Sequence, residues 1–105
     1  MTVVALVPDL MDQSRIRAAL ADVDEVEVTF VRDPARAVGA AVVIVDLARF
    51  ADRIAEIRAA TPGRIVAFGP HVDDDALAAA RSAGADVVVP RSQFFRDPAA
   101  VVTGA

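Results

Sequence analysis

Short runs of apolar, mostly β-branched residues alternate with segments of helical pattern five times along the chain. This alternation is typical of an α/β fold with a parallel sheet. The strands are predicted at residues 3–7, 26–31, 41–45, 64–68 and 86–89. Most of these runs are almost continuously apolar, which indicates strands buried on both faces. Right-handed crossovers then favour a five-stranded parallel sheet in the flavodoxin-like order 2-1-3-4-5, with helices on both faces.

The helices are predicted at residues 12–23, 34–39, 50–61, 73–83 and, with a weaker pattern, 93–102. In the first of them, Ile16, Leu20 and Val23 lie on one apolar stripe. Pro62 marks the end of the third, because proline disfavours helical backbone in the residue before it. The connections are only a few residues long, so a single domain is expected to span residues 1–105.

Composition excludes several classes of protein. The chain has no cysteine, which excludes disulfides, thiolate metal sites and a cysteine nucleophile. It has eleven scattered arginines, no lysine and a net charge of -4, so we expect no binding to nucleic acid. No apolar run approaches the roughly 20 residues of a membrane span, and the first residues lack the pattern of a secretory signal. We therefore expect a cytoplasmic protein that does not bind membranes.

The candidate site lies at the carboxyl ends of the strands, where this fold binds its ligands. Asp46 ends the third strand, and Asp9 follows the first strand, which is its expected neighbour. Two carboxylates there suit a hard cation such as Mg²⁺, so Asp9 and Asp46 are candidate metal ligands. Arg91 follows the fifth strand and could pair with an anion at the same edge of the sheet. Each residue also has a structural interpretation. Asp46 would cap the following turn or helix, Asp9 would be a first-turn acid favoured by the helix dipole, and Arg91 would be a surface charge or a salt-bridge partner.

Signatures of common enzymes and cofactors are missing from the sequence. There is no glycine-rich nucleotide motif and no nucleophile elbow. His71 has neither a cysteine nor a second histidine beside it, which argues against a transition-metal site. The three consecutive acids at 73–75 are interpreted as charge at the start of a helix. We therefore expect a protein that is not an enzyme and requires no cofactor, with Mg²⁺ as an optional ligand.

Two segments carry a resemblance to a known family. The first is Val-Ile-Val-Asp-Leu at residues 43–47, and the second is Ala-Arg-Ser-Ala-Gly-Ala-Asp at residues 80–86. Together with the order of elements over essentially the whole chain, they resemble the response-regulator receiver domains (CheY-like) of bacterial two-component signal transduction. The resemblance implies that Asp46 is the phospho-acceptor of a phosphorelay. It also implies that Asp9 belongs to the acidic pair that holds Mg²⁺.

Three positions depart from the pattern of that family. Pro8 precedes Asp9 where receivers have a second acid. Gly69 stands where they have a serine or threonine whose hydroxyl follows the phosphoryl group. Arg91 follows Pro90, where receivers have a lysine and then a proline, and arginine is not a neutral replacement for lysine. The resemblance therefore points to an atypical or degenerate pseudo-receiver.

Phe94 and Phe95 are adjacent aromatic residues in a chain that has only five. Neighbours on a helix point about 100° apart, so one would face the sheet and the other is a candidate contact residue. Receivers associate through the surface of the fourth helix, fifth strand and fifth helix, so the resemblance implies a homodimer interface that contains both phenylalanines. The alternative is that both pack beneath a short last helix.

These observations predict a stand-alone receiver-like signalling domain that acts by protein–protein interaction without phosphorylation. Its partner would be a histidine kinase or an output protein. One alternative is a phospho-accepting receiver that uses Asp46, binds Mg²⁺ weakly through Asp9 and has Arg91 in place of the lysine. A further alternative is a small-ligand binder or an enzyme on the same scaffold, because this fold hosts many functions.

Overall fold

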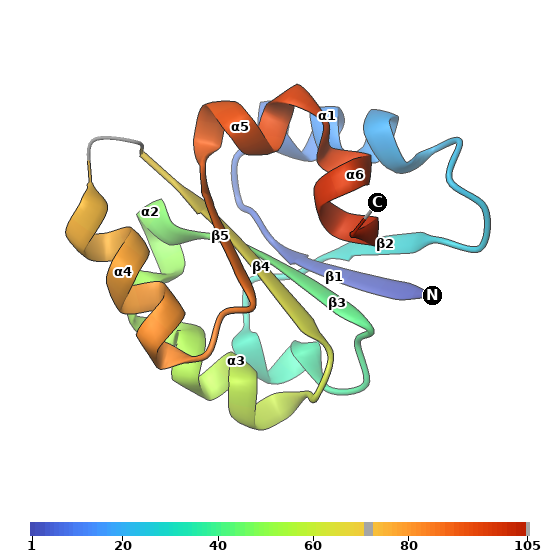
Figure 1. Ribbon diagram of the computed structural model, residues 1–105. Helices are drawn as coiled ribbons and strands as arrows, with labels where there is room; N and C mark the ends of the chain where they lie inside the picture. Colours follow the sequence, from blue (N-terminus) through green and yellow to red (C-terminus); the bar gives the residue numbers. More distant parts are fainter. Residues whose placement is uncertain (71–72, 105) are drawn as a thin grey trace.

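The computed structural model describes residues 1–70 and 73–104, which form one sheet with helices on both faces (Figure 1). All neighbouring strands are parallel and follow the order β2-β1-β3-β4-β5, which confirms the predicted topology. The strands are β1 (Thr2–Leu6), β2 (Glu27–Phe30), β3 (Val42–Asp46), β4 (Arg64–Gly69) and β5 (Val87–Pro90). Every predicted strand end lies within one residue of the observed end.

The helices are shorter and more divided than the sequence pattern predicted. They are α1 (Leu10–Leu20), the 3-10 turn η1 (Pro34–Ala37), α2 (Leu47–Phe50), the 3-10 turn η2 (Ala51–Arg53), α3 (Ile54–Ala60), α4 (Asp74–Ala83), α5 (Arg91–Arg96) and α6 (Pro98–Thr103). The single helix predicted at 50–61 is therefore wrong. Helical backbone begins at Leu47, directly after β3, and Phe50 interrupts it with φ -127° and ψ 24°.

Two other helix predictions need correction for local reasons. The helix predicted at 93–102 is two helices, because Pro98 cannot donate a backbone hydrogen bond and instead starts α6, capped by Asp97. The helix predicted at 12–23 is α1, which begins two residues earlier, after the cap at Asp9, and ends at Leu20. Val23 is half-buried but lies beyond the end of that helix.

Two apolar cores lie on the opposite faces of the sheet, since successive side chains of a strand point to opposite sides. The side covered by α2, α3 and α4 is filled by residues that include Val43, Val45, Ile54, Ile57 and Leu77. The side covered by α1, α5 and α6 is filled by residues that include Ile16, Leu20, Val42, Ile44 and Phe94. Figure 1 shows α3 and α4 below the sheet and α1, α5 and α6 above it.

The topology determines where a functional site can form. All five parallel strands end at one edge of the sheet, and β3 is the central strand, buried along its whole length including Asp46. Residues that follow the strands therefore gather around Asp46. Within 1–70 and 73–104, no helix is long and apolar enough to span a membrane. His71, considered above as a metal ligand, lies outside the described residues.

Candidate functional site at the carboxyl ends of the strands

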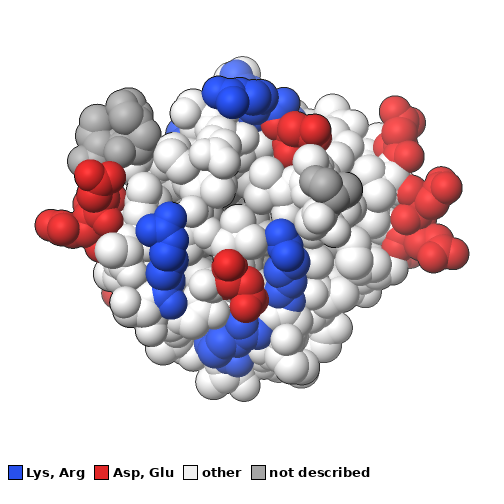
Figure 2. Space-filling model, viewed as in Figure 1, with Lys and Arg blue, Asp and Glu red and all other residues white. Residues whose placement is uncertain are grey.

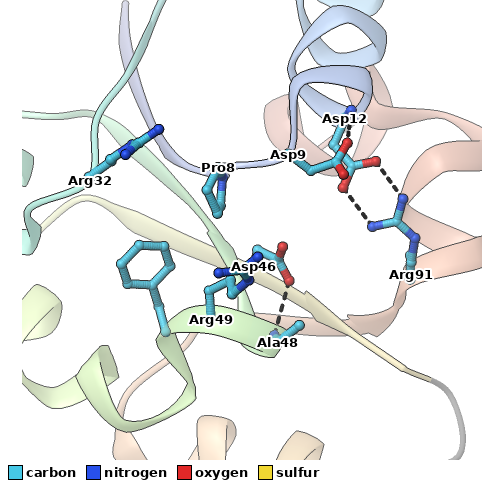
Figure 3. Close-up of a pocket in the computed structure, with 9 residues that line it drawn as sticks. Pro8, Asp9, Asp12, Arg32, Asp46, Ala48, Arg49 and Arg91 are labelled. Atoms are coloured by element: carbon cyan, nitrogen blue, oxygen red, sulfur yellow. Dashed lines mark hydrogen bonds and ion pairs between the residues drawn. The ribbon is translucent and has the colours of Figure 1, made fainter.

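A hollow of about 630 Å³ lies at the carboxyl edge of the sheet (Figure 3). Its walls carry three aspartates, three arginines and an apolar remainder: Pro8, Asp9, Asp12, Arg32, Asp46, Ala48, Arg49, Phe50 and Arg91. The structure thus brings together the three polar residues selected from the sequence, Asp9, Asp46 and Arg91. It adds three that were not selected, Asp12, Arg32 and Arg49.

Asp46 is the last residue of β3 and the N-cap of α2. One of its carboxylate oxygens, Oδ1, accepts a hydrogen bond of 3.0 Å from the backbone N–H of Ala48, so the capping interpretation describes its local geometry. The residue is only 7% exposed. Burial is the main cause that raises the pKa of Asp46, the bond from Ala48 opposes the shift, and the nearby Asp12 carboxylate adds to it. A buried carboxylate at a strand end is thus the central charge of the hollow.

Asp9 caps the first helix. Its side-chain Oδ1 accepts a hydrogen bond of 3.0 Å from the backbone N–H of Asp12, one of the otherwise unpaired donors at the start of α1. In the same turn, the Gln13 side chain donates to the backbone oxygen of Val7 at 2.9 Å, which ties α1 to the end of β1. Asp9 therefore has a structural role and also lines the hollow.

Arg91 pairs with Asp12 and not with Asp46. Its Nη1 donates to Oδ2 of Asp12 at 2.7 Å, and its Nη2 donates to Oδ1 of the same carboxylate, which makes a two-pronged ion pair between α5 and α1. The Asp12 side chain is 4% exposed, whereas that of Arg91 is 44% exposed. The hydrogen bonds from Arg91 to Asp12 raise the pKa of the Arg91 guanidinium. Arg91 thus pairs with Asp12, whereas the sequence analysis expected it to pair with a bound anion.

Gly69, at the end of β4, is enclosed by apolar side chains. A Cβ at this position would lie 3.2 Å from Cβ of Leu47 and 3.4 Å from Cδ2 of Leu77. Both contacts are tighter than or at the edge of ordinary van der Waals distance. A side chain at this position would therefore need Leu47 to shift slightly.

The carboxylates of the hollow make a weak donor set for a divalent cation. Pro8 contributes no side-chain oxygen, Asp12 is held in its ion pair, and Asp9 accepts from the backbone of α1. Across residues 1–70 and 73–104, no group of three or more Asp, Glu, His or Cys is placed to hold a metal ion. Mg²⁺ prefers a nearly complete octahedron of oxygen ligands. Binding through Asp9 and Asp46 stays a prediction, and no chemical step is derived through a metal.

Phe94 and Phe95 both belong to an aromatic cluster next to the hollow. Phe94 is fully buried and stacks on Phe68, with ring centres 4.7 Å apart. Phe95 is half-buried and meets both rings edge-on, while the Arg91 guanidinium lies 4.8 Å from the centre of the Phe95 ring. Phe94 is thus part of the core, and a contact role for Phe95 stays a prediction. Arg91 joins the aromatic cluster to Asp12.

Solved structures of response regulators share this architecture, although no family model and no curated protein matches the sequence. A response regulator from Burkholderia pseudomallei, with a phosphorylated aspartic acid, a calcium ion and citrate, has a TM-score of 0.80 and 14% identity over 96% of this chain. This chain spans 65% of that protein. A receiver domain protein from Clostridium thermocellum has a TM-score of 0.78 and 18% identity, with 98% of this chain and 91% of the other covered.

A third structure, a response regulator from Hahella chejuensis, has a TM-score of 0.77 and 24% identity, with 97% of this chain and 92% of the other covered. These likenesses confirm that the chain has the CheY-like fold of response-regulator receiver domains. Because identity is below 25% in all three, they concern the fold and not the chemistry of the site.

Proposed function

We propose that this chain is a receiver-type signalling domain that acts through a protein partner and does not depend on phosphorylation of Asp46. The observation that carries the proposal is the ion pair between Arg91 and Asp12. Phosphorylation would add negative charge to a buried carboxylate that already lies near the Asp12 carboxylate. The cation that would balance this charge is already bound to Asp12 through two hydrogen bonds.

Two further features support the same conclusion. Pro8 occupies the position at which receivers have a second metal-binding acid, so the charge of a phosphoryl group would be poorly neutralised. Gly69 has no hydroxyl to follow such a group, and Leu47 and Leu77 leave little space for one. A modification of Asp46 would therefore lack both stabilisation and a route to the rest of the molecule.

Intact-mass spectrometry tests this proposal. The protein is incubated with a small acyl phosphate and Mg²⁺, quenched in acid and compared with Asp46→Asn. Asp33→Asn is the matched control, because Asp33 makes the same kind of bond to a backbone N–H two residues later, at an exposed position. We expect no phosphoryl adduct on any of the three proteins. An adduct on the unmodified sequence and on Asp33→Asn that is absent from Asp46→Asn would overturn the proposal.

A phospho-accepting receiver is the second candidate function, and the position of Asp46 favours it. Asp46 ends the central strand and opens onto the hollow, and the similar Burkholderia protein carries a phosphorylated aspartic acid and a calcium ion. In this case Asp46 would be the nucleophile, Asp9 would help to hold the cation, and Arg91 would leave Asp12 to contact the phosphoryl group. The mass measurement described above separates the two candidates.

The partner is proposed to be a histidine kinase, an output protein or a second copy of the chain, bound at the surface of α4, β5 and α5. β5 is an edge strand, so one of its sides has no neighbouring strand. Figure 2, which views the molecule over β5 and α4, shows basic side chains beside acidic ones and, in the part of the chain described, no broad basic patch on this face. That mixture favours a protein partner over nucleic acid. Sedimentation velocity over a concentration series tests for the homodimer.

A further inference from the structure

The charged walls of the hollow fall into two chemically different sides. Figure 3 shows Asp9, Asp12 and Arg91 together on one side, Arg32 and Pro8 on the other, and Asp46 and Arg49 between them. On the first side the charges satisfy one another, because Arg91 binds Asp12 and Asp9 caps α1. Arg32 on the other side and Arg49 in the middle form no ion pair within the described residues.

Arg32 and Arg49 reach the hollow from separate elements. Arg32 follows β2, and Arg49 belongs to α2, yet both line the same cavity. Among residues 1–70 and 73–104, neither forms an ion pair, whereas Arg53, Arg58 and Arg91 do. Two exposed guanidinium groups therefore border one hollow, and within the described residues neither donates a side-chain hydrogen bond, although the charge of Arg49 is close enough to lower the pKa of Asp46. Planar guanidinium groups are well suited to bind the oxygens of a phosphate, two at a time.

The hollow also has an apolar wall. Pro8 and the half-buried ring of Phe50 line the hollow together with Ala48. At about 630 Å³ the hollow is far larger than a phosphate ion needs, and lies within the range of roughly 300–1,000 Å³ that is usual for small-molecule pockets. A ligand that fills it would have an anionic group and an organic group.

We propose that the hollow binds a phosphomonoester without covalent reaction, with its phosphate between Arg32 and Arg49 and its organic group against Pro8 and Phe50. The three carboxylates do not prevent this. Asp12 is neutralised by Arg91, and Asp9 lies on the far side with them. Asp46 lines the hollow beside Arg49, but it is only 7% exposed and accepts a hydrogen bond from the backbone of Ala48. The proposal is independent of whether Asp46 is ever phosphorylated, and it gives the domain a small-molecule input.

Isothermal titration calorimetry tests the proposal with two probes, phenyl phosphate and inorganic phosphate. We expect phenyl phosphate to bind more tightly, since only it contacts the apolar wall. Arg32→Gln and Arg49→Gln should each weaken binding of phenyl phosphate by about tenfold or more, the usual effect of losing a charged hydrogen bond. Arg36→Gln is the matched control, because Arg36 is an exposed arginine near Arg32 that does not line the hollow. It should leave the affinity unchanged.

Three outcomes would overturn this inference. One is the lack of saturable binding of phenyl phosphate, and another is equal weakening by Arg36→Gln, which would indicate a general effect of charge. The third is equal affinity for the two probes, which would exclude recognition of the organic group. All three arginines are exposed, so the variants are expected to fold, and thermal denaturation checks this. The titration contains no acyl phosphate, so it leaves phosphorylation of Asp46 untested, and the separate mass measurement with an acyl phosphate distinguishes failure of the proposed function from failure of this inference.

Discussion

Charged side chains have more partners within the protein at the amino end of the sheet than at its carboxyl end. At the amino end, below the starts of β3, β4 and β5, Arg58 of α3 donates to the backbone oxygens of Gly84 and Gly63. It also donates to the backbone oxygen of Thr61 at 3.0 Å and to the Asp86 carboxylate at 3.0 Å. One arginine thus joins two connections of the chain, α3–β4 and α4–β5, through hydrogen bonds within the protein.

At the carboxyl end, Arg91 and Asp12 pair with each other, but other charged groups have fewer partners. Asp46 is buried with one backbone hydrogen bond, and Arg32 and Arg49 have no ion pair with any residue of 1–70 and 73–104. The pKa values of Asp86 at the amino end and Asp46 at the carboxyl end are shifted in opposite directions. The N–H of Ile65 is the main cause that lowers the pKa of Asp86, whereas burial is the main cause that raises the pKa of Asp46. The folded environment thus favours the charged carboxylate at the amino end and disfavours it at the carboxyl end.

The largest effect that tests this comparison is expected at Gly63. A Cβ there would lie 2.3 Å from the backbone oxygen of Ala40 and 2.7 Å from that of Ala41, so Gly63→Ala must displace backbone at the amino end. We expect a loss of about 3 kcal/mol or more in the free energy of unfolding, measured by urea denaturation. Gly39→Ala is the control, because Gly39 has φ +79° but open space around it. It should cost about 1 kcal/mol, and an equal loss in the two variants would contradict the expectation.

The next effect concerns Arg58 itself. Arg58→Met keeps much of the aliphatic stem but removes every hydrogen bond of the guanidinium group, which leaves the Asp86 carboxylate without its ion pair. We expect a loss of about 2–3 kcal/mol in the free energy of unfolding. Arg53→Met is matched to it, since Arg53 forms an exposed pair with Glu56 on the next turn and should cost under about 0.5 kcal/mol. Similar losses in both would show that the amino end has no special role.

A smaller effect is expected at Asp86, and it should depend on pH. Because the folded state lowers the pKa of Asp86, its carboxylate stabilises the fold above the unfolded value of 3.8, and this stabilisation is lost as the pH falls through the folded pKa. Asp86→Asn should therefore lower the melting temperature at neutral pH, by an amount that corresponds to about 1 kcal/mol, and the difference should shrink in acid. A difference that grows in acid would be evidence against this account.

The smallest effect is expected at Asp46, and its sign is reversed. Because burial raises the pKa of Asp46 in the folded state, the charged carboxylate destabilises the fold at neutral pH. This cost disappears as the pH falls through the folded pKa toward 3.8. Asp46→Asn keeps an oxygen that accepts from Ala48, so we expect it to raise the melting temperature at neutral pH and to have little effect in acid. A lower melting temperature at neutral pH would make Asp46 a structural residue.

The sequence predicted the sheet better than the helices, for a physical reason. A buried parallel strand is a continuous apolar run, and every one of the five was found within a residue of its ends. An apolar stripe shows which side of a helix is buried, but it does not show where local backbone geometry interrupts the helix. Thus the stripe through Ile54 and Ile57 was correct, but the break at Phe50 was not visible, whereas the break at Pro98 could have been predicted from proline alone.

The candidate site could be predicted in part. Asp9 and Asp46 follow neighbouring strands, so the strand order alone places them at one edge of the sheet. Arg32 directly follows the segment predicted as the second strand, so the sequence places it at the same edge, but no role was predicted for it. Asp12 and Arg49 carry no such signal, because Asp12 lies within a helix and Arg49 lies in a helix whose start was predicted three residues too late.

The sequence by itself determined the fold class, the central position of Asp46 and the departures at Pro8 and Gly69 from the receiver pattern. Only the tertiary structure decided which charges are engaged and which remain available. Asp12 and Arg91 are 79 residues apart in the chain and meet because α1 and α5 cover the same face of the sheet. Which partner an arginine selects depends on distance and burial in three dimensions, and these depend on how all the elements pack together.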